Sequence, residues 1–379
     1  MIANRMESFN PFIVMEVLEH AQRLQQDGIN VIHLEVGEPD FCTPVKIVNA
    51  GRAALDAGDT HYTHSLGVWE LRESIARHYN LTYHVNISPE QVIVTSGTSP
   101  GMLLMFSALL NPGDEVICSN PGYACYPNFI QYVDANVCYV NVHESSGFAL
   151  QPDDVRKQIN SHTKAILINS PSNPTGQLLS STTLSQLAEL GALVISDEIY
   201  HGLVYGEQPH SILEFTDNAI VLNGFSKRFA MTGWRLGYLI VPSDLVRPIQ
   251  KLQQNFFISA NSFVQQAGIA ALDDNHPELE IMRQTYDERR KYMVKRLRDI
   301  GFGITVEPKG AFYVFANARH LCSDSYQFAF DVLKNAHVAI TPGIDFGSNG
   351  EGYIRFSYAN SLENIQVGLD RLERYLKSQ

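Results

Sequence analysis

Short, uninterrupted apolar segments rich in valine and isoleucine recur along the middle of the chain. Such runs are typical of strands buried on both faces of a sheet, and their alternation with helices indicates an α/β fold. Helical stretches lie between several of them, as at 101–110 and 182–191. The predicted strands lie at 91–95, 115–120, 136–142, 164–170, 192–198, 219–224 and 236–242.

The pattern changes toward the two ends of the chain. Residues 11–27 have helical periodicity, and residues 30–41 are typical of a strand that runs into a turn. Near the other end, a long charged helix is predicted at 278–300 and a shorter helix at 325–335. Apolar strands and a closing helix surround the shorter one, which indicates a smaller α+β unit.

The length of 379 residues allows more than one folding unit. We expect a large domain at 43–280, with a mostly parallel sheet covered by helices, and a small domain at 281–379. The N-terminal arm at 1–42 is expected to join the small domain. Hydrophobic residues make up 45% and charged residues 18%, which is an ordinary globular balance.

The formal net charge of −12 argues against a nucleic-acid partner, because nucleic-acid binders present a basic face. No apolar run is long enough to cross a membrane, and the first residues lack the apolar core of a signal peptide. The five cysteines form no C-x-x-C pair, so we expect reduced thiols in the cytoplasm. Neither cysteines nor histidines have metal-binding spacing, so no metal site is expected.

Polar residues follow most of the predicted strands. In an open α/β sheet, ligands bind at the carboxyl ends of the strands. Polar groups from five strand ends can therefore meet in one crevice. They are Ser96, Thr98, Ser99, Tyr123, Asn173, Asp197, Tyr200, Ser226 and Lys227.

The segment TSGTSPG at 95–101 permits two functional interpretations. It contains G-x-S-x-G, the pattern of a serine-hydrolase nucleophile at Ser99. However, the residue after Ser99 is Pro100, which has no N–H to stabilise an oxyanion. In the other interpretation, Gly97 and the N–H groups of Thr98 and Ser99 form an anion cradle at a helix N-terminus. A plain capped turn between strand and helix also accounts for the segment.

The other polar residues have ordinary structural explanations when each is taken alone. Asn173 lies in SPSNPTG, a strong turn signal, and Asp197 can cap a helix. Lys227 can lie in a solvated loop. Together they supply an amine, a carboxylate, hydrogen-bonding groups, an aromatic face and, with Arg235, a phosphate pocket. Pyridoxal phosphate needs all of these groups, since it has an aldehyde, a ring nitrogen, a phenolic oxygen, a phosphate and a flat ring.

The chain resembles the class I/II aminotransferases, which are pyridoxal-phosphate enzymes of fold type I. The resemblance runs over nearly the whole chain, and SNPTG together with SKxxxMTGWRxGY makes it specific. The motifs that carry it are VGEPDF, HYTHSLGVWELRESIA, TSGTSPG, NPGYACYP, SPSNPTG, SDEIYHGLVY, FSKRFAMTGWRLGY, KGAFYVF and YIRFSYA.

The resemblance implies a role for each residue of the cofactor site. Lys227 would form an imine (aldimine) with the cofactor, and Asp197 would keep the ring nitrogen protonated. Asn173 and Tyr200 would bond the phenolic oxygen, and Tyr123 would stack on the ring. The residues expected around the phosphate are Gly97, Thr98, Ser99, Ser226 and Arg235, with Tyr62 from a neighbouring subunit, which implies a homodimer.

For the substrate, the resemblance implies that Arg355 grips the α-carboxylate, with Gly37 and Asn173 beside it. The expected reaction moves the amino group of an L-amino acid to a 2-oxo acid by a ping-pong mechanism, with Lys227 as general base and acid. Tyr123 and Ser99 depart from the aspartate-specific enzymes, which argues against dicarboxylate specificity. The sequence does not assign the donor or the acceptor.

Three alternatives remain open at this stage. A β-lyase acting on an amino acid, such as a C–S lyase, would begin from the same lysine-bound cofactor. A catalytically silent binding protein would share the fold. A serine hydrolase using Ser99 would belong to a different class, and Pro100 argues against it.

Overall fold

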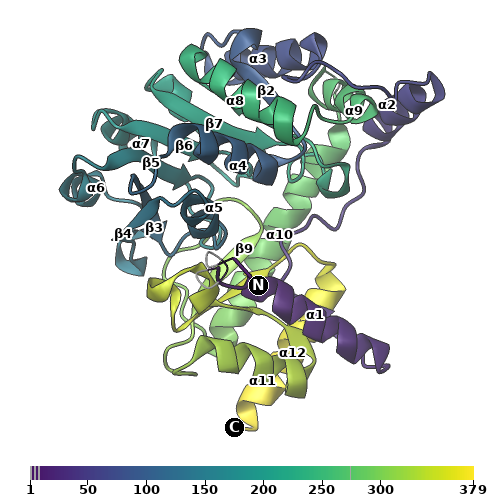
Figure 1. The fold of residues 1–379 in the computed structure, drawn as a ribbon. Coiled ribbons are helices and arrows are strands. Elements are labelled where there is room, and N and C mark those ends of the chain that lie inside the picture. The colour runs from purple at the N-terminus through teal and green to yellow at the C-terminus, as the bar shows by residue number, and fades with distance from the viewer. Residues whose placement is uncertain (1, 4–5, 7–8, 274) are drawn as a thin grey trace.

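The computed structural model describes residues 2–3, 6, 9–273 and 275–379. Helices account for much of this part of the chain, and most of them flank the strands of one sheet (Figure 1). The α-helices are α1 (Ile13–Gln26), α2 (Val45–Asp56), α3 (Trp69–Tyr83), α4 (Thr98–Leu109), α5 (Tyr126–Tyr132), α6 (Pro152–Gln158), α7 (Ser181–Ala188), α8 (Ser243–Phe256), α9 (Ser262–Asp273), α10 (Pro277–Ile300), α11 (Ser325–Ala336) and α12 (Leu362–Lys377).

The strands form three sheets. The largest has the order β2-β8-β7-β6-β5-β3-β4, in which β8 is antiparallel to both of its neighbours and all other pairs are parallel. Its strands are β2 (Val92–Thr95), β3 (Glu115–Asn120), β4 (Asn136–Asn141), β5 (Thr163–Asn169), β6 (Leu193–Asp197), β7 (Ala219–Gly224) and β8 (Gly237–Ile240). This arrangement confirms the predicted α/β fold with a mostly parallel sheet.

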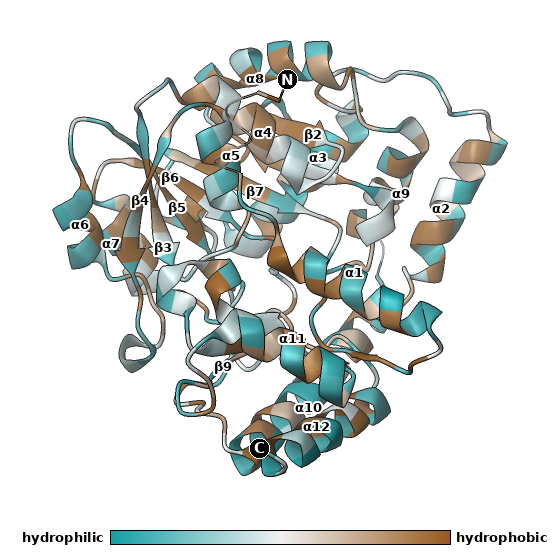
Figure 2. Cartoon of the chain, turned by 60° about the horizontal axis from the view of Figure 1, so that its bottom comes forward, coloured by the Kyte–Doolittle hydropathy of each residue, from teal (hydrophilic) through white to brown (hydrophobic). Residues whose placement is uncertain are grey.

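Both faces of the large sheet are buried except at the edge strand β4, whose side chains are mostly half-buried or exposed. Along β2, Val92 and Val94 belong to one hydrophobic cluster, and Ile93 belongs to another. Helices α3, α7 and α9 contribute to the first cluster, whereas α4 and α8 contribute to the second. Successive side chains of a strand point to opposite faces, so a strand covered on both sides must be apolar throughout. The strands are accordingly mostly brown in Figure 2.

A second group of elements packs around the long helix α10, which runs from beside the large sheet toward the C-terminal elements (Figure 1). It contains an antiparallel sheet of order β11-β12-β9 and a parallel pair, β1-β10. The strands are β1 (Ile32–His33), β9 (Tyr313–Asn317), β10 (Val338–Ala339), β11 (Thr341–Pro342) and β12 (Tyr353–Ser357). The β1–β10 pair joins the N-terminal region to this group, while the predicted domain boundaries near 42 and 280 stay predictions.

The strand expected over 30–41 is much shorter in the structure. Only Ile32 and His33 pair, and β10 is as short as β1. The chain then turns and brings Gly37 to the end of the large sheet, where its carbonyl accepts a hydrogen bond from Lys227. No helix in the described part of the chain has the length and apolar character needed to cross a bilayer.

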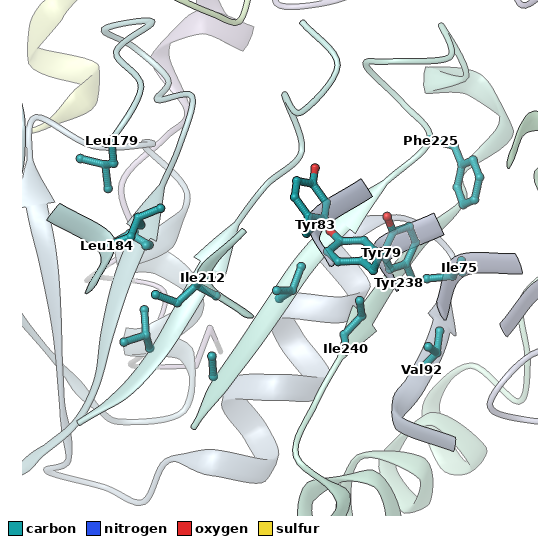
Figure 3. Packing of buried hydrophobic residues seen from close by; sticks show 14 of the residues in the cluster. Ile75, Tyr79, Tyr83, Val92, Leu179, Leu184, Ile212, Phe225, Tyr238 and Ile240 are labelled. Atoms are coloured by element: carbon teal, nitrogen blue, oxygen red, sulfur yellow. The ribbon is translucent and has the colours of Figure 1, made fainter. Parts of the chain in front are cut away.

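A buried polar cluster lies beneath the carboxyl end of β6. The Glu198 carboxylate accepts hydrogen bonds from Ser196, Ser211, the Ile212 N–H and the Tyr79 hydroxyl, at distances of 2.9–3.1 Å. Burial raises the pKa of Glu198 to about 7. Tyr79, Tyr83 and Tyr238 lie together against the sheet here (Figure 3), and Asn223 donates to the Tyr79 hydroxyl at 2.8 Å. The cluster therefore fixes the strand end that carries Asp197.

Replacing Tyr79 by phenylalanine should destabilise the protein, because it leaves the Asn223 amide unpaired and removes one donor from Glu198. We expect a loss of about 1–3 kcal/mol in the free energy of unfolding, which is typical of a buried polar group left without its partner. Urea denaturation followed by circular dichroism measures this difference. The exposed Tyr326→Phe variant is the control and should unfold like the wild type. Equal midpoints for the two variants would contradict the role of the cluster.

Candidate active site

Strand ends of the large sheet and elements of the C-terminal group together enclose a cavity of about 380 Å³. Residues after β5, β6 and β7 line it, together with the first turn of α4 and parts of α1 and β12. The predicted site residues that line it are Gly37, Thr98, Ser99, Tyr123, Asn173, Asp197, Tyr200, Ser226, Lys227, Arg235 and Arg355.

At one end of the cavity, the chain makes a turn at the start of α4 whose shape depends on two glycines. Gly97 has a φ of 105°, and a Cβ on it would lie 2.6 Å from Nη2 of Arg235. A Cβ on Gly237 would lie 2.7 Å from the backbone of Gly97. Arg235 has a φ of +57°, an uncommon conformation for a residue other than glycine. The two glycines therefore allow the Arg235 guanidinium to approach the positive end of α4 closely.

Asp197 ends β6 inside the cavity. Its Oδ2 accepts a hydrogen bond of 2.7 Å from the Tyr126 hydroxyl, and its Oδ1 accepts one of 3.1 Å from the Ile199 N–H. Burial raises the pKa of Asp197 to about 6, and the two hydrogen bonds and the charge of Lys227 oppose that rise. The carboxyl group is therefore mostly ionised at pH 7, although it is buried.

Lys227 follows the end of β7, and its amine lies within the same cavity. The amine donates a hydrogen bond of 2.7 Å to the Gly37 carbonyl. Burial lowers the pKa of Lys227 to about 8, and the charges of Arg355 and Arg235 act in the same direction. An appreciable fraction of the amine is thus uncharged near neutral pH and able to accept a proton.

The Arg355 guanidinium from β12 is fully buried at another side of the cavity. Its Nη1 donates to Oδ1 of Asn173 at 2.8 Å, and its Nη2 donates to the Glu35 carbonyl and, at 3.2 Å, to the Thr341 hydroxyl. The ring centroid of Tyr313 lies 4.3 Å from the guanidinium carbon. Nε has no hydrogen-bond partner among the described residues.

Tyr200 and Tyr313 meet through their hydroxyl groups, which are 2.9 Å apart. A Cβ on Gly37 would lie 1.8 Å from the Tyr313 hydroxyl oxygen, so only glycine fits at this position. The close approach of these three residues explains why VGEPDF, SDEIYHGLVY and KGAFYVF, which are far apart in the sequence, contribute to one site.

The wall of the cavity formed by α1 is apolar and consists of Phe12, Val14, Met15 and Leu18. The α1 helix has no side-chain cap of its own, and the Asp345 carboxylate accepts hydrogen bonds from the N–H groups of residues 13 and 14 instead, at 2.9 and 3.3 Å. Hydrophobic and hydrophilic residues alternate along the helix (Figure 2). Asp345 thus anchors the start of the helix that provides this wall.

Two predicted residues do not line the cavity. Gly97 lies directly behind Arg235 and shapes the turn. The side chain of Tyr62 is 80% exposed and does not reach the cavity of its own chain. Its expected contact with a neighbouring subunit stays a prediction.

Sequence reasoning missed Tyr126 and Tyr313. It considered the region of Phe12, Ile13 and Phe346 for the substrate side chain without assigning roles, and it did not single out Val14, Met15 and Leu18. Tyr126 lies three residues after Tyr123 in NPGYACYP, and Tyr313 lies in KGAFYVF, so both belong to motifs that had been recognised. No spacing rule indicated that the hydroxyl of Tyr126 reaches Asp197, because tertiary packing alone brings them together.

Comparison with known proteins identifies the family to which this chain is similar. The family model described as aminotransferase class I and II matches residues 29–372. A (5-formylfuran-3-yl)methyl phosphate transaminase from Methanocaldococcus jannaschii is 43% identical, over 99% of this chain and 100% of the relative. An aspartate aminotransferase from Pyrococcus horikoshii is 39% identical, over 100% of this chain and 98% of the relative.

Solved structures show the same relationship. The aspartate aminotransferase of Thermus thermophilus with maleate superposes with a TM-score of 0.95 at 34% identity, over 99% of both chains. A Methanococcus jannaschii protein described as similar in its active site to kynurenine aminotransferases gives a TM-score of 0.92 at 42% identity, over 99% of this chain and 100% of that one. The chain therefore belongs to the class I and II aminotransferases.

Proposed function

We propose that this aminotransferase uses pyridoxal phosphate to move the amino group of an L-amino acid to a 2-oxo acid by a ping-pong mechanism. The observation that carries the proposal is the burial of the Lys227 amine and the Asp197 carboxylate in one cavity, with an anion cradle at its end. The class I and II family implies the same cofactor.

The residues present fit pyridoxal phosphate. The start of α4 with Arg235 and Ser226 would hold the phosphate, and the close approach at Gly97 leaves no room for a side chain there. Asp197 would hold the ring nitrogen, Tyr123 would cover the ring, and the neighbouring Asn173 and Tyr200 would bond the phenolic oxygen. When bound, the cofactor supplies an aldehyde that reacts with amines and a ring that accepts electrons from the substrate's Cα–H bond.

Lys227 has two tasks in this proposal. Its amine would hold the cofactor's aldehyde carbon between reactions, and once released it would take the proton from the substrate Cα and return it. A pKa near 8 suits this work, because the uncharged amine is available at neutral pH. The Gly37 carbonyl keeps the amine oriented into the cavity.

Asp197 would hold a proton on the cofactor's ring nitrogen. A carboxylate that is ionised yet buried interacts strongly with a nearby positive charge, since little water screens the pair. The Tyr126 hydroxyl and the Ile199 N–H fix both carboxylate oxygens, so the group needs no rearrangement when the ring binds.

Arg355 would bind the substrate's α-carboxylate. Its guanidinium is immobilised by Asn173, Glu35 and an aromatic ring, and the unpartnered Nε leaves a donor free for a carboxylate. Fixing the carboxylate also fixes which bond of the substrate Cα faces the cofactor ring.

The structure gives the alternatives little support. The relatives named above are transaminases or aminotransferases rather than lyases. Ser99 lies in the first turn of α4, and Pro100 follows it without an N–H for an oxyanion.

We propose that the donor's side chain contacts the apolar wall of α1, which favours aromatic and aliphatic amino acids over aspartate. The homodimer with Tyr62 in the neighbouring site and the cytoplasmic location are further parts of the proposal.

The purified protein should transfer amino groups from a panel of amino acids to 2-oxoglutarate, pyruvate or oxaloacetate. We expect one new amino acid for each donor consumed, and Lys227→Ala should abolish transfer because the reacting amine is lost. The absorption band of the lysine-bound cofactor should disappear in the same variant, whereas the exposed Lys251→Ala should keep both properties. Release of ammonia without an acceptor would favour the lyase instead.

Replacing Arg355 by alanine should weaken amino-acid binding by about 2–5 kcal/mol, the usual loss when one partner of a buried charge pair is removed. Arg355→Lys should fall between alanine and the wild type, because it keeps the charge and loses the planar fork. Half-reaction titrations followed by cofactor absorbance measure the binding. A variant that saturates like the wild type, with cofactor still bound, would refute the role of Arg355.

Replacing Tyr126 by phenylalanine should raise the pKa of Asp197, because a hydrogen bond that favours the ionised carboxylate is lost. A raised pKa leaves more of the carboxyl protonated at a given pH, so activity should decline earlier as the pH falls. We expect the acid limb of the kcat/KM profile to move upward by about one pH unit. An unchanged acid limb would show that Tyr126 does not act through Asp197.

A further inference from the structure

A second cavity, of about 260 Å³, shares no lining residue with the candidate active site. Side chains of α3, the end of α9, the first turns of α10 and the segment after β7 surround it. The polar residues and the glycine that matter for its chemistry are His78, Gly202, Arg228, His276, Glu280 and Arg283.

Arg228 brings a positive charge to this cavity, and its guanidinium carbon lies 5.1 Å from the centroid of the Phe229 ring. Its Nη1 donates to Nε2 of His78 at 3.1 Å, and no carboxylate of the described residues pairs with it. Burial and the charge of Arg228 lower the pKa of His78 to about 4, so the imidazole stays neutral at pH 7 and its Nε2 accepts the hydrogen bond from Arg228. The remaining guanidinium donors of Arg228 have no partner in the part of the chain that the structure describes.

The placement of Arg228 is built into the fold. Gly202 has a φ of +95°, and a Cβ on it would lie 2.6 Å from Cδ of Arg228. Only glycine combines this backbone conformation with room for the arginine stem. The guanidinium is thus held over Gly202 beside the cavity.

A second guanidinium, from Arg283, also lines the cavity. It donates to Glu280 through Nε and Nη2, at 2.8 and 2.6 Å, and to the Val204 carbonyl through Nη1. Glu280 has a half-exposed side chain and is the one described carboxylate on the lining. Among the described residues, two arginines and one carboxylate therefore line this cavity, in a chain whose formal net charge is −12.

His276 has a buried ring nitrogen with no hydrogen-bond partner among the described residues. The residue is 6% exposed and precedes Pro277 at the start of α10, where the helix dipole is positive. Its Nε2 lies 2.9 Å from the Ala270 carbonyl, which requires a proton on that nitrogen. Its Nδ1 is buried without a partner among the described residues.

We propose that this cavity binds a small dianionic oxyanion, such as phosphate or a small dicarboxylate. The bound anion accepts hydrogen bonds from the Arg228 guanidinium, and Arg283 adds charge at the rim. Because Arg228 follows Lys227 directly in the chain, the anion braces the segment that carries the active-site amine. The site is separate from the anion cradle at the start of α4, so both can be filled at once.

Isothermal titration calorimetry of the holoenzyme with inorganic phosphate tests this site, at constant ionic strength in a phosphate-free buffer. The wild type should bind saturably, and Arg228→Gln should weaken binding about tenfold or more, as expected for a lost hydrogen bond to a charged group. Arg247→Gln, which removes an exposed arginine on α8, is the matched control and should leave the Kd unchanged.

Two further variants should change the affinity for phosphate in opposite directions. Arg283→Gln should weaken phosphate binding, whereas Glu280→Gln should strengthen it, because it removes the carboxylate from the rim. Cofactor absorbance in every variant shows that the active site stays filled, which separates a failure of this site from a failure of the proposed function. Competition by succinate would identify a general dianion site, and its lack would identify a phosphate site. No saturable binding by the wild type, or binding by Arg228→Gln and Arg283→Gln as tight as that of the wild type, would overturn the proposal.

Discussion

The site depends on the burial of two groups away from water, the Lys227 amine and the Asp197 carboxylate. Burial acts on both groups by disfavouring their charged forms, so it lowers the pKa of Lys227 and raises that of Asp197. The two pKa values move toward neutrality from opposite sides. The large sheet makes this possible, because parallel strands buried on both faces bring their ends to a single dry edge.

Much of the large sheet could be predicted from the sequence, because its strands are continuous apolar runs that few other structures explain. The strand predicted at the start of 30–41 pairs over only Ile32 and His33 before the chain turns. Ile32 and Leu34 belong to a hydrophobic cluster of the C-terminal group, and apolar character alone does not show how many residues of such a segment pair as a strand. Helices α2, α3, α8 and α9 were also not identified, and α8 contains Pro248.

The candidate site was predictable to the extent that its residues follow strands. Lys227, Asp197 and Asn173 each come at or after a strand end, so topology alone brings them together. Tyr126 and Tyr313 were not predictable in this way, because their hydroxyl groups reach Asp197 and Tyr200 across the fold. Sequence patterns locate the groups that react, whereas the groups that orient them emerge only from packing.

Asp345 anchors the helix α1, which forms the apolar wall of the cavity. This wall and the groups proposed to react lie on different parts of the chain. The groups proposed to react belong to strand ends between residues 95 and 235 and to β12, whereas the apolar wall belongs to the N-terminal helix α1 and the residue before it. In the proposed function, substitutions in α1 would change the shape of the cavity wall while the amine and the carboxylate keep their surroundings.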